Sequence, residues 1–116
     1  MAYINQEMKR ARAPHIKTVL KKYGMKGSIA IRNHSTLVVN LKEGAIDFGA
    51  DHIQVNTYWI DKNYEGAARE FLMELKTAML GEDWYDRSDS QTDYFDTAFY
   101  VSINVGDWNK PYQAIS

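Results

Sequence analysis

The chain has 116 residues, of which 45% are hydrophobic and 25% charged, and its formal net charge at pH 7 is −1. Because a chain of this length encloses one hydrophobic core and its composition is that of an ordinary globular protein, we expect a single domain over residues 1–116. Cysteine is absent, which excludes disulfides, thiolate catalysis and cysteine-based zinc sites, and no apolar run reaches the roughly 18 residues that a membrane span needs.

Residues 1–27 are predicted to be helical and basic. Residues 4–13 can form a helix, but Pro14 disfavours helical geometry in the residue before it and suits the first position of a new helix. We therefore expect two helical pieces, the second with an apolar stripe beneath a basic exterior. The apolar residues of this stripe are Ile16, Val19, Leu20 and Tyr23.

Three strands are predicted next, at residues 28–33, 36–42 and 52–60. The first and third alternate apolar with polar residues, and the second is rich in β-branched residues. A short turn at residues 33–35 joins the first two, so we expect them to form an antiparallel hairpin.

A second helix and a fourth strand complete the predicted elements. A broad apolar stripe indicates a helix over about residues 64–80, with Asp61 or Asn63 as its N-cap and Gly81 at its end. Residues 96–106 alternate as a strand, and residues 107–116 form a surface tail anchored by Trp108 and Tyr112. The core-facing side chains of the fourth strand are Phe99, Val101, Ile103 and Val105.

The order of these elements is α-β-β-β-α-β. Three consecutive strands joined by short turns favour an antiparallel meander with helices packed on one face. The sequence therefore predicts an α+β fold with an antiparallel sheet of about four strands and two main helices on one face. Residues 1–27 are the basic helical segment, residues 28–106 hold the sheet and the second helix, and residues 107–116 are the C-terminal tail.

Charge is distributed unevenly along the chain. Residues 1–42 hold nine Lys and Arg against one acid, and residues 43–116 hold five against fourteen, so the two parts have net charges of +8 and −9. Such asymmetry indicates a charged partner, unless the two parts neutralise each other on the folded surface. A homo-oligomer joined through complementary charges is a further expectation.

The acidic loop, residues 81–97, holds six acids and one base with aromatic residues between them. Two of its carboxylates, Asp96 among the candidates, could form a catalytic pair, but the spacing of the acids singles out no particular pair. A calcium loop is disfavoured because Gln91 stands where a glycine belongs and no Glu closes the loop. A net charge of −5 could imitate a phosphate track and occupy a basic groove, or the loop could simply be solvated and held by its aromatic residues. The predicted partner-binding residues are Asp83, Trp84, Tyr85, Asp86, Asp89, Asp93 and Tyr94.

The basic N-terminal part is a second candidate surface, for nucleic acid. The element order is similar to that of double-stranded-RNA-binding domains. That module has a lysine cluster at the start of its second helix, whereas the second helix here opens with Glu65 and a single basic residue, Arg69. The three histidines, His15, His34 and His52, are scattered and indicate no metal site. The predicted phosphate-contacting residues are Lys9, Arg10, Arg12, Lys17, Lys21, Lys22, Lys26 and Arg32.

Two stretches, residues 21–48 and 78–112, resemble one of the large polyvalent protein-associated domains of phages, prophages and conjugative elements. The resemblance covers about residues 14–112. It implies a mobile-element protein that acts on host defence or on invading DNA, and it brings no catalytic residues with it. The features that carry it are Lys22-Tyr23-Gly24, the turn at residues 32–36, the segment at residues 89–94, and the strand end at residues 104–108.

The leading hypothesis from the sequence is a non-enzymatic phage or mobile-element accessory protein that binds a host or phage macromolecule through the acidic loop. It would act in the bacterial cytoplasm, away from membranes, as a counter-defence protein that mimics nucleic acid. No cofactor, metal ligand or catalytic residue is predicted. The alternatives are a nucleic-acid-binding protein that uses the basic helix, and a small enzyme or metal-binding protein that uses the acidic loop.

Overall fold

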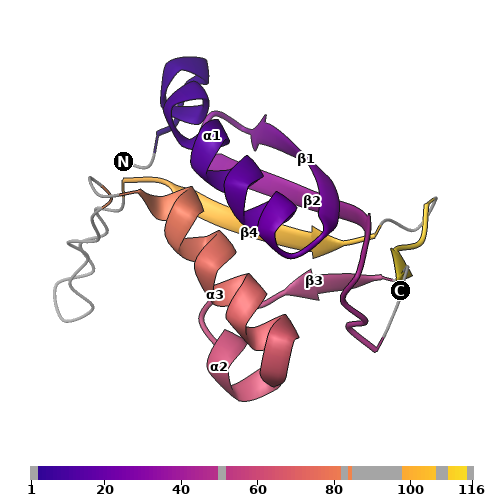
Figure 1. The fold of residues 1–116 in the computed structure, drawn as a ribbon. Coiled ribbons are helices and arrows are strands. Elements are labelled where there is room, and N and C mark those ends of the chain that lie inside the picture. Colours follow the sequence, from indigo (N-terminus) through magenta and orange to yellow (C-terminus); the bar gives the residue numbers. More distant parts are fainter. Residues whose placement is uncertain (1–2, 50–51, 82–83, 85–97, 107–109, 115–116) are drawn as a thin grey trace, which may run out of the picture.

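The computed structural model describes residues 3–49, 52–81, 84, 98–106 and 110–114. It confirms the α+β class, with two main helices and about four main strands (Figure 1). The helices are α1 (Gln6–Lys22), α2 (Ile60–Asn63) and α3 (Gly66–Leu80), and the strands are β1 (Met25–Arg32), β2 (Thr36–Gly44), β3 (Ile53–Val55), β4 (Tyr100–Val105) and β5 (Gln113–Ala114).

The sheet is mixed rather than antiparallel throughout. Its order is β1-β2-β4-β3, and β5 pairs with the end of β2. The pairs β1–β2 and β3–β4 are antiparallel, whereas β4 lies parallel to β2 and separates it from β3. The predicted meander of the first three strands is therefore wrong, although the hairpin of the first two is confirmed.

The central position of β4 follows from its length and hydrophobicity. β3 has three residues and offers little pairing, whereas β4 has six, and its Ile103 and Val105 are fully buried. The connection from β2 to β4 contains β3, α2 and α3, so it is long enough for the crossover that a parallel pair requires. The longer apolar strand occupies the middle of the sheet, and β3 lies at its edge.

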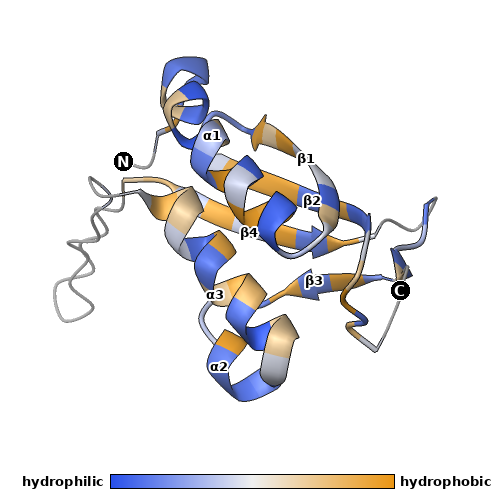
Figure 2. Ribbon diagram, viewed as in Figure 1, coloured by the Kyte–Doolittle hydropathy of each residue, from blue (hydrophilic) through white to orange (hydrophobic). Residues whose placement is uncertain are grey.

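Both main helices cover the same face of the sheet, as the sequence predicted (Figure 1). The side chains of Leu37, Val39 and Leu41 alternate toward this face and are almost completely buried. Hydrophobic residues are concentrated in β2 and β4 (Figure 2). The helices complete the same core with Ile16, Leu20, Phe71, Leu72, Leu75 and Met79. The alternate residues of the strands therefore project from the opposite face, away from α1 and α3.

α1 is one continuous helix and not two pieces. Asn5 caps it, because its side-chain oxygen accepts a hydrogen bond from the Met8 amide at 2.9 Å. Pro14 lies inside the helix, where it lacks the N–H that an internal residue donates. Arg12 before Pro14 and Ile16 after it are both buried. Tertiary packing on both sides of Pro14 therefore keeps the helix continuous.

α3 starts two residues later than the sequence predicted. Its N-cap is Glu65, and neither predicted cap serves it, because Asp61 and Asn63 belong to the short α2. Gly81 ends α3 as predicted, with φ of 74° and its N–H donating to the Thr77 carbonyl at 3.1 Å.

β3 ends at Val55, well before the predicted end of the third strand. The chain then turns at residues 56–59 into α2. Trp59 precedes α2 and is 47% exposed, and the Lys62 ammonium lies 4.6 Å from the centre of its ring. The alternating pattern of residues 52–60 was thus only partly that of a strand.

Candidate functional site

A row of polar side chains crosses the face of the sheet that the helices leave uncovered. Ser28 on β1 pairs in register with Asn40 on β2, Asn40 with Asn104 on β4, and Asn104 with Gln54 on β3. The Asn104 amide nitrogen donates a hydrogen bond to the Asn40 side-chain oxygen at 3.0 Å. Because each amide has further donor and acceptor capacity, this row presents hydrogen-bonding groups across four strands.

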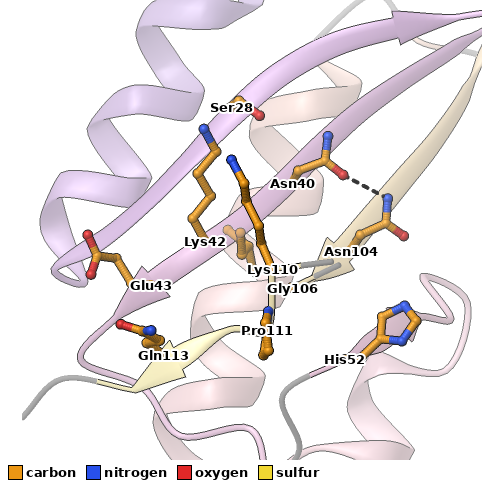
Figure 3. A pocket seen from close by; sticks show the side chains of 11 residues that line it. Ser28, Asn40, Lys42, Glu43, His52, Asn104, Gly106, Lys110, Pro111 and Gln113 are labelled. Carbon is orange, nitrogen blue, oxygen red and sulfur yellow. Dashed lines mark hydrogen bonds between the residues drawn. The ribbon is translucent and has the colours of Figure 1, made fainter. Parts of the chain in front are cut away.

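An open cleft of about 810 Å³ lies on this face and is lined by the asparagine pair. Figure 3 shows Lys42 from β2 and Lys110 from the C-terminal segment extending into the cleft, with His52 on its other side. Its volume lies in the range of ligand-binding clefts. Glu43 also lines the cleft, and its carboxylate pairs with the Lys26 ammonium at 3.5 Å. We call the set Ser28, Asn40, Lys42, His52, Asn104, Lys110 and Gln113 the polar cleft.

The C-terminal segment is held over the sheet by Tyr112. Its hydroxyl donates a hydrogen bond to the Ile46 carbonyl at 2.6 Å, and its ring makes an edge contact with Phe48 at 5.3 Å. Burial raises the pKa of Tyr112 to about 12, with a smaller contribution from the charge of Asp47. This anchor, which the sequence predicted, fixes Lys110 and Gln113 on the cleft. The other predicted anchor, Trp108, lies outside the described residues.

Gly27 allows β1 to approach β2 closely beside the asparagine pair. A β-carbon at this position would lie 2.6 Å from the Asn40 carbonyl oxygen. The register of β1 against β2 shifts between Lys26 and Gly27, immediately before Ser28. The bulge therefore requires a glycine, and it sets how the edge strand borders the cleft.

Arg12 is placed differently from what the sequence predicted, because it is buried and its exposed fraction is 6%. Its guanidinium donates hydrogen bonds to the carbonyls of Met79 and Leu80 at 3.1 Å each, and to the Met8 carbonyl at 3.2 Å. It also stacks 4.7 Å from the centre of the Phe99 ring. Arg12 thus binds the carbonyl end of α3 and is not part of an exposed phosphate-contacting face.

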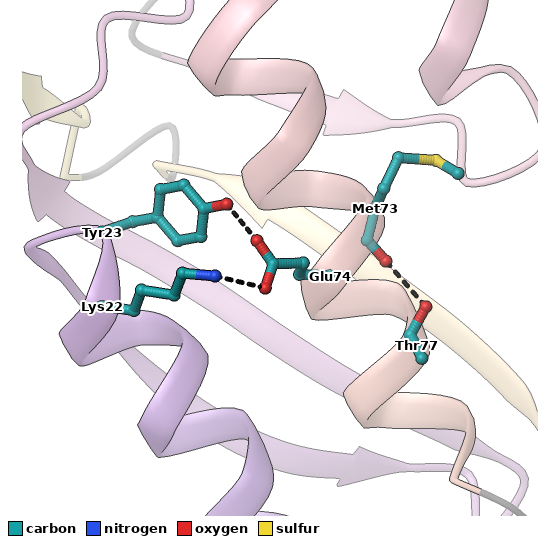
Figure 4. A network of polar contacts seen from close by, with 5 residues as sticks. All are labelled: Lys22, Tyr23, Met73, Glu74 and Thr77. Carbon is teal, nitrogen blue, oxygen red and sulfur yellow. Dashed lines mark hydrogen bonds and ion pairs between the residues drawn. The ribbon is translucent and has the colours of Figure 1, made fainter.

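The other predicted basic residues are at the surface, but not all of them are unengaged. Lys22 pairs with Glu74 at 2.9 Å, and Glu74 also accepts a hydrogen bond from the Tyr23 hydroxyl (Figure 4). The hydrogen bond from Tyr23 lowers the pKa of Glu74 most, and the hydrogen bond and charge of Lys22 lower it further. These contacts join α1 to α3. Lys26 pairs with Glu43, as described above. Of the remaining predicted residues, Lys9 is half-buried. The exposed ones are Arg10, Lys17, Lys21 and Arg32.

Of the predicted contact residues in the acidic loop, only Trp84 is described. Its indole N–H donates to the Phe99 carbonyl at 2.8 Å, and its ring packs against the core. This hydrogen bond joins the chain before residues 85–97 to the chain after them. The other predicted residues lie outside the described ones: Asp83, Tyr85, Asp86, Asp89, Asp93 and Tyr94.

Within the described part of the chain, no group of three or more His, Asp or Glu is arranged to hold a metal ion. The suggestion of a metal or catalytic site in the acidic loop stays a prediction. None of the described helices combines the length and hydrophobicity required to cross a membrane.

Basic side chains outnumber acidic ones among the residues that the structure describes. The described residues contain thirteen of the fourteen Lys and Arg but only seven of the fifteen Asp and Glu, which is a net charge of +6. The residues outside the described ranges hold one Arg against eight Asp and Glu, so the net charge of the whole chain is −1.

The polar cleft was missed by the reasoning from the sequence. Asparagine is depleted in strands, so Asn40 and Asn104 in two apolar strands were the available signal. Joining them required the parallel pairing of β2 with β4, which the predicted meander did not contain. Lys110 could be added only once Tyr112 had placed the C-terminal segment.

Comparisons of this chain with protein-family models, curated proteins and solved structures gave no match. The resemblance to a polyvalent protein-associated domain therefore stays a prediction.

Proposed function

We propose that this protein binds nucleic acid on the open face of its sheet, with the polar cleft as the centre of the contact. The observation that supports the proposal most strongly is that Lys42, Lys110 and the hydrogen-bonded pair Asn40–Asn104 line one cleft on a face that the helices do not cover. The two ammonium groups of Lys42 and Lys110 favour an anionic partner over a neutral one at this cleft.

The residue types in the cleft match the two parts of a nucleotide. Lysine ammonium groups neutralise phosphates and contribute affinity that depends on salt. Asparagine amides donate and accept hydrogen bonds, which suits the edges of bases. Arg32, exposed at the other end of β1, adds positive charge at that end of the sheet. The function is thus one of binding, in which the lysines supply affinity and the amides contact the bases.

The test compares two double variants that remove the same charge from different surfaces. Lys42→Gln with Lys110→Gln alters the cleft, and Lys17→Gln with Lys21→Gln alters the exposed side of α1. Binding of a fluorescent oligonucleotide is followed by anisotropy between about 50 and 200 mM salt. The cleft variant should bind about tenfold or more weakly, and the slope of log affinity against log salt should fall by about 1.4, since each single-strand phosphate contact contributes about 0.7.

The α1 variant is the matched control and should stay close to the wild type. A loss confined to the α1 variant would move the interface to the basic helix, which was the alternative from the sequence. Absence of binding by the wild-type protein at low salt would overturn nucleic-acid binding altogether.

A second candidate function involves the acidic loop. We propose that a basic protein surface of the host or of a phage binds there, in keeping with the predicted mobile-element context. The observation in favour is that the hydrogen bond from Trp84 to the Phe99 carbonyl joins the two sides of residues 85–97, whose net charge is −3. Replacing Asp86, Asp89 and Asp93 with Asn should abolish capture of the partner from host lysate. Recovery of the same partners by this variant would exclude the loop as the contact.

A further inference from the structure

A second, smaller hollow borders the open face of the sheet at the end remote from the polar cleft. It has a volume of about 170 Å³ and lies between β4, the turn before α2, and α3. Two tyrosines on its rim are strongly exposed, Tyr58 at 75% and Tyr100 at 48%. The other residues that line it are Thr57, Lys76, Leu80, Trp84, Phe99 and Val101.

Tyr100 belongs to the same face as the polar cleft. It alternates with Ser102 and Asn104 on β4, so it projects from the side of the sheet that carries the asparagine pair. Four residue steps lead from Tyr100 to Asn104, which corresponds to about 13 Å along β4. Ser102, between them on this face, is buried, so a bound chain would contact Tyr100 and the amide pair on either side of it.

Tyr58 is exposed, yet the backbone around it is fixed. Its N–H donates to the Asn56 side-chain oxygen at 3.0 Å, and the Lys76 ammonium donates to the neighbouring Thr57 carbonyl at 2.9 Å. The same ammonium lies 5.6 Å from the centre of the Tyr58 ring. Lys76 thus brings a positive charge beside the ring and also supports the turn that presents it.

We propose that Tyr58 and Tyr100 stack on bases of a single strand and so make the protein selective for single-stranded over duplex nucleic acid. This rests on the proposed function and specifies its substrate class. Exposed tyrosine faces beside a lysine are the usual means of holding unpaired bases, since every base has a face that can stack. In a duplex the faces of the bases are already occupied by their neighbours, so phosphates, sugars and base edges remain available to the protein but the base faces do not.

The test measures anisotropy with a labelled single strand and with a duplex of the same sequence. The wild type should bind the single strand at least about tenfold more tightly, because stacking contributes roughly 1–3 kcal/mol per base. Tyr58→Ala with Tyr100→Ala should remove most of this preference and leave the salt slope unchanged, since no charge is lost. Tyr58→Phe with Tyr100→Phe keeps both rings and should keep the preference for the single strand. Met73→Ala, at an exposed apolar position of α3, is the control and should also keep it.

The outcomes separate this inference from the function on which it rests. Failure of the wild type to bind either oligonucleotide overturns both. Equal binding of single strand and duplex by the wild type overturns the stacking role alone. The same holds if the alanine variant keeps its preference, or if the phenylalanine variant loses it as fully as the alanine variant does.

Discussion

At the scale of single residues, the side chain that organises this fold is a charged one. Arg12 is buried in α1, and a buried charge is tolerated only when its hydrogen bonds are made. Its donors reach the carbonyls of Met79 and Leu80, which have no partner within α3 because the helix ends there. The positive charge also lies at the negative end of the helix dipole. From the sequence alone, Arg12 could not be told from its exposed neighbours.

Arg12→Met keeps most of the side-chain length and removes the donors. We expect the free energy of unfolding to fall by about 2–4 kcal/mol, because the terminal carbonyls of α3 lose charged hydrogen bonds in a buried place. Urea denaturation followed by circular dichroism measures this. Arg10→Met, on the exposed side of the same helix, should change stability by less than about 0.5 kcal/mol. Equal effects of the two substitutions would show that Arg12 has no special structural role.

At the scale of elements, the local sequence pattern predicted whether a segment forms a helix or a strand better than it predicted the position of that segment in the fold. The alternation in residues 96–106 correctly identified Phe99, Ile103 and Val105 as core residues, and the stripe in α3 was equally clear. Pro14 misled because tertiary contacts outweighed a local preference. The strand order could not be read locally, because β4 pairs with β2 across more than fifty residues. The polar cleft depends on that pairing, so it was inaccessible for the same reason.

The contact between α1 and α3 should make stability depend on pH at the acidic end. The hydrogen bond from Tyr23 and the ion pair with Lys22 lower the pKa of Glu74, so this carboxylate stabilises the fold above its ordinary pKa of 4.5. That contribution is lost as the pH falls through the lowered value. Glu74→Gln should lower the melting temperature at pH 7 and flatten its decline between about pH 5 and pH 3.

Thermal melts across this pH range measure the effect. Asp61→Asn, which alters an exposed acid of α2 outside this contact, is the control and should give the acid limb of the wild type. A Glu74→Gln profile that runs parallel to the wild type would mean that this contact does not contribute to the pH dependence.

At the scale of the whole molecule, α1 and α3 cover one face of the sheet, and the polar cleft lies on the other. On that second face Val38 and Ser102 are buried, whereas Lys42 and Tyr100 are exposed. Tyr58 and Tyr100 line the smaller hollow. Under the proposed function, Lys42 and Lys110 attract phosphates, and the amides of Asn40 and Asn104 contact bases.

The most direct measurement is an NMR titration of the ¹⁵N-labelled protein with a single-stranded oligonucleotide. The side-chain amide signals of Asn40 and Asn104 should shift and saturate together with the backbone signals of Lys42 and Tyr100. Signals from the exposed side of α1, including Lys17, should stay in place. Shifts confined to α1, with both asparagine amides unchanged, would contradict binding on the open face of the sheet.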